Sequence, residues 1–222
     1  MDITGSMFSY VDQAKSNIIN IINRIINECP GIDINLGFIG YRDIYEEAYG
    51  NVVDIEFTQN HTELKNEIEN TFASGGDDEP EDVSWAFEKA LNKTWKNNAR
   101  FIVFVADAPN HGIKYHNNFV FDSYPDGIPG RRDLEDLIKE IADNGISMFC
   151  MKLNYNTDIM LKIFEDVYKN YEKCQFQIVP MDSANSFSDV VVEAATNVYE
   201  NQRMNDENKS SDNRKIIKSE LE

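Results

Sequence analysis

The feature that most constrains the fold is an unbroken apolar run, residues 101–106, that ends at Asp107. A strand that is apolar on both faces needs cover on both faces, which is typical of a parallel sheet with helices on each side. Asp107 would then lie at the carboxyl end of a central strand, and ligands of open α/β sheets bind outside that edge. We therefore expect a functional site near Asp107.

Strand and helix patterns alternate along the rest of the chain. Apolar residues at three- and four-residue steps predict helices over residues 8–28, 62–72, 80–91, 131–144, 159–171 and 187–199. Period-two or continuous apolar runs predict strands over residues 32–41, 52–57, 100–107, 146–153 and 174–179. This order predicts an α/β fold: a Rossmann-like, doubly wound three-layer sandwich whose mostly parallel sheet has one antiparallel edge strand, residues 52–57.

The predicted domain covers residues 1–200. Residues 108–130 form a long loop within it, and loops of this length are often functional. Beyond the domain, apolar residues become sparse and charged and polar residues dominate. We interpret residues 201–222 as a charged polar tail or linker.

The first residues of the chain carry a pattern of oxygen ligands. Asp2, Thr4 and Ser6 alternate, so in an extended loop their side chains project to the same side. One carboxylate and two hydroxyls, with room for water, suit a hard cation such as Mg²⁺. An alternative is that Ser6 only caps the following helix and Asp2 is a solvated charge.

A second acidic loop begins with Gly75 and Gly76 and continues through Asp77 and Asp78. Taken alone, its acidic residues are interpreted as charge at the positive end of the following helix. Taken with Asp2 and Asp107, they favour metal ligation by Asp78, with Asp77 as a neighbour.

Three segments resemble one family: Asp-Ile-Thr-Gly-Ser-Met at 2–7, Gly-Gly-Asp-Asp-Glu-Pro-Glu-Asp-Val at 75–83, and Ala-Asp-Ala-Pro-Asn-His-Gly at 106–112. They are similar to von Willebrand factor type A domains, of the kind found with alpha-type protein kinases in protists. The resemblance implies a metal-ion-dependent adhesion site holding Mg²⁺, with Mn²⁺ or Ca²⁺ as alternatives. The ligands it implies are Asp2, Thr4, Ser6, Asp78 and Asp107. It also implies a protein-interaction module without catalytic activity, in or related to an alpha-kinase-linked regulatory protein, that binds a protein partner through its metal-site face.

The sequence departs from the family pattern at its first strand. The family places a buried apolar strand directly before the first aspartate, whereas only Met1 precedes Asp2 here. We therefore expect the first central strand to be missing and the domain to be truncated at its N-terminal side. The flanking strands, 34–39 and 101–106, would then pair directly or leave a gap one strand wide.

The second departure is at the second loop, where the family commonly has threonine and this chain has Asp78. Asp2, Asp78 and Asp107 together carry more negative charge than one divalent cation neutralises. We therefore do not expect the site to bind an acidic group of a partner.

An enzyme is the competing interpretation. In a phosphatase of the haloacid-dehalogenase type, Asp2 would be the nucleophile for phosphoryl transfer. Such an enzyme has a second catalytic aspartate where this chain has Thr4, and its metal loop follows a strand rather than the helix predicted at 62–72.

Two histidines near Asp107 are candidates for a zinc site. His111 and His116 do not have the spacing of a helical pair, and no third ligand is apparent in the sequence. We expect them to make local hydrogen bonds.

Composition excludes some partners. The chain has 39 acidic and 21 basic residues, a formal net charge of −18, which repels nucleic acid and favours cations and basic protein surfaces. No apolar run approaches the roughly 20 residues of a membrane span. Cys29, Cys150 and Cys174 have no paired spacing, so we expect free thiols in a reducing compartment and an intracellular, cytoplasmic location.

Overall fold

The computed structural model describes residues 1–31, 33–44, 46, 51–96, 99–181, 188–197 and 200. Its elements, in chain order, are the 3-10 helix η1 (Gly5–Ser9), α1 (Val11–Glu28), β1 (Leu36–Gly40), β2 (Val53–Thr58), α2 (His61–Asn70), α3 (Val83–Leu91), β3 (Phe101–Ala106), α4 (Leu134–Asp143), β4 (Ser147–Lys152), α5 (Asp158–Tyr168) and β5 (Phe176–Pro180). Residues 188–197 are also helical. The predicted tail, residues 201–222, lies outside the described residues.

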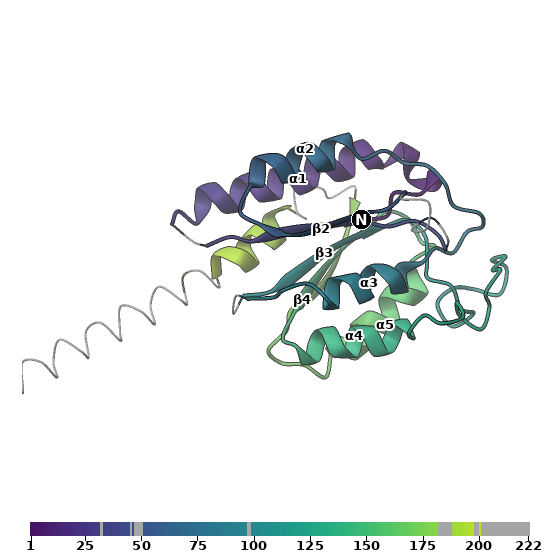
Figure 1. Cartoon of the computed structure of the whole chain (residues 1–222). Coiled ribbons are helices and arrows are strands. Elements are labelled where there is room, and N and C mark those ends of the chain that lie inside the picture. Colours follow the sequence, from purple (N-terminus) through teal and green to yellow (C-terminus); the bar gives the residue numbers. More distant parts are fainter. Residues whose placement is uncertain are drawn as a thin grey trace, which may run out of the picture.

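The helices cover both faces of the strands, as Figure 1 shows: α1 and α2 lie on one side and α3, α4 and α5 on the other. Strands β3, β4 and β5 form a parallel sheet in that order, and β1 pairs with β2 in an antiparallel ladder. The predicted α/β three-layer fold and its antiparallel strand at residues 52–57 are confirmed.

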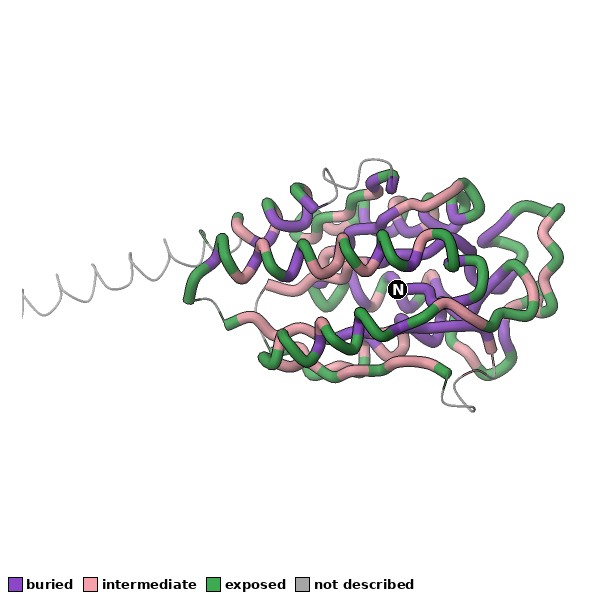
Figure 2. Tube along the Cα trace, turned by 90° about the horizontal axis from the view of Figure 1, so that it is seen from above, coloured by how far each residue is buried: buried purple, intermediate pink, exposed green. Residues whose placement is uncertain are grey.

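The core has a separate cluster on each face of the sheet. Along β4, Met148 and Cys150 contribute to the cluster under α3–α5, while Phe149 and Met151 contribute to the cluster under α1 and α2. All of them are at most 1% exposed, so β4 is a strand buried on both faces. In the view of Figure 2, buried residues run along the helices in an alternating pattern with exposed ones, as amphipathic helices require.

Residues 1–3 lie between β1 and β3, where Asp2 forms an isolated parallel β-bridge with Tyr41. The Tyr41 N–H donates to the Met1 carbonyl over 3.1 Å, and the Ile3 N–H donates to the Tyr41 carbonyl over 3.0 Å. On the other side, the Asp2 N–H donates to the Val105 carbonyl over 2.8 Å. The N-terminus therefore lies in the middle of the fold in both views (Figures 1 and 2).

A cavity next to Met1 separates β1 from β3. Among the described strands, β1 and β3 share no hydrogen-bonded ladder. A cavity of about 640 Å³ lies between them, lined by apolar side chains of α1, α2, α3 and both strands. We call this cavity the strand slot.

The strand slot explains a difference from the expected burial of β3. Residues 104–106 are buried, but Phe101, Ile102 and Val103 are only half-buried. These three residues pair with β4 and also line the slot. Separately, none of the described helices combines the length and the apolar character that a membrane span requires.

Candidate metal centre

Three loops meet at the carboxyl edge of the sheet and are tied by backbone hydrogen bonds. The Gly5 N–H donates to the Gly75 carbonyl over 2.9 Å, which joins the first loop to the second. The Glu81 N–H donates to the Pro109 carbonyl, also over 2.9 Å, which joins the second loop to the third. Residues far apart in the sequence are thereby held at one place.

The four ligands predicted in the first and third loops form one chain of contacts. The Asp2 Oδ1 atom accepts hydrogen bonds from the Thr4 N–H, over 2.9 Å, and from the Thr4 hydroxyl, over 2.7 Å. The Thr4 and Ser6 hydroxyl oxygens are 3.1 Å apart, and the Ser6 hydroxyl donates to Asp107 Oδ1 over 2.8 Å. Ser6 is exposed, so the cluster is open to solvent on that side.

The second carboxylate oxygen of Asp2 tests whether a cation fits. Asp2 is fully buried, and its Oδ2 atom has no hydrogen-bond partner. A buried carboxylate oxygen without a partner is costly. Burial, reinforced by the charge of Asp107, raises the pKa of Asp2 to about 7, and burial also raises the pKa of Asp107. A divalent cation would remove both costs, so these residues fit the ion that the sequence predicts.

Glu81 is a site residue that the sequence analysis did not identify. It is 2% exposed, and its Oε2 atom has no hydrogen-bond partner. Burial, together with the charge of Asp2, raises the pKa of Glu81 to about 10. A Cβ atom added to Gly76 would lie 2.8 Å from Glu81 Oε1 and 3.4 Å from Thr4 Cβ, so the glycine loop and Glu81 pack directly against the first loop. An acidic residue just before a helix is compatible both with a metal ligand and with a charge at the positive end of that helix.

Asp82, the next residue, has a structural role. Its Oδ1 atom accepts the Trp85 N–H over 2.9 Å and caps α3. Its Oδ2 atom accepts a hydrogen bond from Arg131 Nε over 2.8 Å. Both oxygens therefore have protein partners, and Asp82 is not a ligand candidate.

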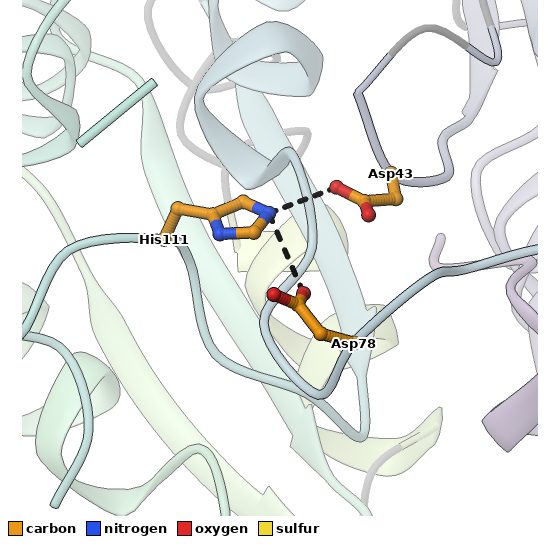
Figure 3. A group of neighbouring side chains, drawn as sticks. All are labelled: Asp43, Asp78 and His111. Carbon is orange, nitrogen blue, oxygen red and sulfur yellow. Dashed lines mark hydrogen bonds and ion pairs between the residues drawn. The ribbon is translucent and has the colours of Figure 1, made fainter. Parts of the chain in front are cut away.

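Asp78 lies beside Asp43 and His111, two residues that are far from it in the sequence. Ligand atoms of Asp43, Asp78 and His111 lie within 4.8 Å of one another (Figure 3). The Asp78 Oδ2 atom accepts the Ser123 N–H over 2.7 Å, while its Oδ1 atom accepts no hydrogen bond and lies 3.9 Å from His111 Nε2. Asp77 is exposed, and its N–H donates to Asp43 Oδ2 over 3.4 Å. Ligation of the first site by Asp78, with Asp77 beside it, stays a prediction.

The two loop histidines contact one carboxylate. His111 Nδ1 is 2.7 Å from Asp122 Oδ1, and His116 Nε2 is 2.9 Å from Asp122 Oδ2. The predicted local hydrogen bonds are confirmed. Burial acts to raise the pKa of Asp122, but the hydrogen bonds from His111 and His116 outweigh it and lower that pKa to about 2.

Comparison with known proteins identifies the same family from independent data. A family model described as the von Willebrand factor A domain matches residues 1–120. The alpha-protein kinase vwkA of Dictyostelium discoideum is 31% identical over 185 residues, which is 82% of this chain and 29% of that protein. The chain thus spans less than a third of the length of this relative.

Solved structures agree on the fold. The VWA domain of SpRpn10 superposes with a TM-score of 0.51 at 14% identity, covering 81% of this chain and 84% of the other. The vWF domain of the type V pili tip protein Mfa5 from Porphyromonas gingivalis superposes with a TM-score of 0.55 at 10% identity, covering 92% and 93%. At these identities the likeness concerns the fold alone.

Proposed function

The chain belongs to the von Willebrand factor A domain family, and from this premise we propose that it is a metal-dependent protein-interaction module. The observation that carries the proposal is the buried, unpartnered Oδ2 atom of Asp2, within a shell of hydroxyl and carboxylate oxygens. Such a shell suits a hard divalent cation. The module would be part of, or related to, an alpha-kinase-linked regulatory protein, which the similarity to vwkA supports.

The proposed ion is Mg²⁺, with Mn²⁺ or Ca²⁺ as alternatives. Its ligands would come from Asp2, Thr4, Ser6 and Asp107, with Asp78 proposed from the family pattern. Glu81 adds a buried carboxylate beside Thr4. Burial disfavours the ionised form of these carboxylates, and the positive charge of the ion would offset that effect.

The proposed partner is a protein that binds on the metal-site face and presents basic or neutral groups there. The carboxylates of the site exceed the charge of one dication, so an acidic group would be repelled. The formal net charge of −18 extends the same preference to the whole surface and disfavours nucleic acid. The three free cysteines favour the proposed intracellular, cytoplasmic location.

We propose no catalytic activity for this chain. In the phosphoryl-transfer alternative, Asp2 is the nucleophile and a second carboxylic acid serves as the general acid. The group at that position here is the Thr4 hydroxyl, which donates to Asp2 Oδ1 over 2.7 Å. A threonine hydroxyl is too weak an acid for that role at neutral pH.

The test is the melting temperature with Mg²⁺ and with a chelator. Mg²⁺ at about 100 times its Kd should stabilise the native wild type by about 2.7 kcal/mol, a rise in Tm on the order of 5–10 °C for a chain of this size. Asp107→Ala should lose most of that rise, because it removes the carboxylate that Ser6 contacts. Asp126→Ala, an exposed loop substitution of the same kind, is the control and should keep it. Equal rises in Tm in all three proteins would mean that Asp107 does not take part in Mg²⁺ binding.

A further inference from the structure

A second cluster of metal-ligating groups lies next to the Asp2 site, and two of its three members, Asp43 and His111, have no part in the proposed function. Asp43 follows β1, Asp78 belongs to the glycine loop, and His111 follows β3, so the cluster joins three loops. Figure 3 shows the three side chains pointing toward one another. The His111 side chain is fully buried, and those of Asp43 and Asp78 are 4% and 3% exposed.

His111 is oriented as a metal ligand would be. Its Nδ1 atom is 2.7 Å from Asp122 Oδ1, which leaves Nε2 facing Asp43 Oδ1 at 2.8 Å. Asp122 is itself fixed, because its oxygens accept the Gly112 N–H over 2.8 Å and the Tyr124 N–H over 2.7 Å. A histidine that binds metal through one ring nitrogen almost always donates the other ring N–H to such a group, which sets its tautomer and ring angle.

Asp78 supplies an independent sign that a ligand is missing from this cluster. Its Oδ1 atom is buried and has no hydrogen-bond partner, while it lies 3.9 Å from His111 Nε2. That distance is too long for a hydrogen bond. A carboxylate oxygen removed from water with only that long ion-pair contact and no hydrogen bond is unfavourable, and a cation placed among the three ligand atoms would satisfy it.

We propose that Asp43, Asp78 and His111 form a second divalent-cation site, distinct from the site at Asp2. Imidazole nitrogen with carboxylate oxygen is a ligand set for a first-row transition dication such as Zn²⁺, whereas Mg²⁺ prefers oxygen alone. Three protein ligands would leave a position for water or for a group of a partner. The ion takes the place of any proton on His111 Nε2, and that proton leaves to solvent.

The sequence alone shows no third zinc ligand near His111 and His116. In the structure the other ligands come from distant loops, and Asp43 is 68 residues from His111 in the chain. His116 is not a ligand in this proposal. It contacts Asp122 and is a positioning residue.

The experiment is a Zn²⁺ titration of the full chain against a chromophoric chelator, with Mg²⁺ in excess to fill the Asp2 site. The wild type should bind one tight equivalent of Zn²⁺. Asp78→Asn and His111→Gln should each weaken it at least about 10-fold, the lower end of what loss of even a supporting group costs. Asparagine keeps the shape of Asp78 and an oxygen for the Ser123 N–H. His61→Gln, a histidine on α2, is the matched control and should leave Zn²⁺ affinity unchanged.

Three results would overturn the proposal: no tight Zn²⁺ in the wild type, unchanged affinity in Asp78→Asn, or loss of the equivalent only in Asp107→Asn, which would place the zinc at the Asp2 site. A second measurement covers the case in which a variant does not fold. In the wild type, Zn²⁺ should shift the nitrogen resonance of His111 Nε2 more than any nitrogen of His116 or His61. An unshifted His111 resonance in zinc-saturated protein would contradict the site without any substitution.

Discussion

At the scale of single residues, the site depends on Gly76. Its φ of 87° lies in the left-handed region that other residues rarely adopt, and its lack of a side chain lets Glu81 Oε1 approach. Backbone conformation and close approach thus require the same glycine. The matched comparison is Gly127, which has a φ of 89° and nothing within 4 Å of its Cβ position.

We predict that Gly76→Ala destabilises the domain more than Gly127→Ala does. Both substitutions strain the backbone, at a cost on the order of 1 kcal/mol, and only Gly76→Ala also displaces Glu81. Gly76→Ala should in addition reduce the Tm increase caused by Mg²⁺, measured by thermal melting with and without the ion. Identical losses of stability and identical Mg²⁺ responses in the two variants would mean that Glu81 packing against the first loop does not matter.

Residue identity alone predicted part of the site. Asp2, Thr4 and Ser6 follow from their alternation, and Asp107 follows from the apolar strand before it; the structure brings these four together. Glu81 was missed because an acid at the start of a helix is explained equally well by the helix dipole. The convergence of Asp43 on His111 was missed because it depends on how distant loops fold over the sheet edge, which periodicity does not encode.

At the scale of elements, periodicity predicted type and order well and ends less well. The helix expected from residue 8 begins at Val11, because residues 5–9 wind as a 3-10 turn. That turn contains Met7, which is fully buried in the core cluster under α1 and α2. The strand expected from residue 174 begins at Phe176. Such ends are set by local hydrogen bonds rather than by the apolar pattern.

Helix α4 provides a prediction about packing that is independent of metal. Leu137 is fully buried in the cluster under α3–α5, so Leu137→Ala should lower the free energy of unfolding by about 2–5 kcal/mol. Lys139→Ala, on the exposed side of the same helix, should leave the free energy of unfolding nearly unchanged, because exposed ion pairs contribute little.

Urea unfolding of both α4 variants gives the comparison, and the Mg²⁺ response of Leu137→Ala should stay close to that of the wild type. A cost below 1 kcal/mol for Leu137→Ala would show that α4 is not held by its apolar face.

At the scale of the whole molecule, the layers were predictable and the use of the N-terminal residues was not. The alternating pattern predicts which faces are covered, since each helix needs a sheet to bury its stripe. It does not say that Met1–Ile3 would pair with both neighbouring strands, which depends on partners from residues 39–41 and 105. The buried Met1 amino group shows the cost of that arrangement, because burial lowers its pKa to about 5.

We predict that about seven apolar, β-branched residues added before Met1 will stabilise the domain by filling the strand slot. Each side chain buried there should contribute on the order of 1.5–3 kcal/mol, and a peptide N–H would replace the buried amino group that now donates to the Ile39 carbonyl. A Gly/Ser extension of equal length is the control. Denaturant unfolding that is equally sharp and equally late with both extensions would show that the slot does not accept a strand.

The pairing of Met1–Ile3 also has a mechanical consequence. Among the described strands there are two hydrogen-bonded sheets, β1–β2 and β3–β4–β5, and the backbone of residues 1–3 bonds to both. A force that pulls the sheets apart therefore acts on these few backbone bonds: Asp2 bonds to Val105 on one side, and its neighbours Met1 and Ile3 bond to Tyr41 on the other. Tension across the domain would separate Asp2 from Asp107 while each sheet kept its own ladder. A bound ion that holds those two carboxylates together would resist that tension directly, so its release would be the first event of forced opening.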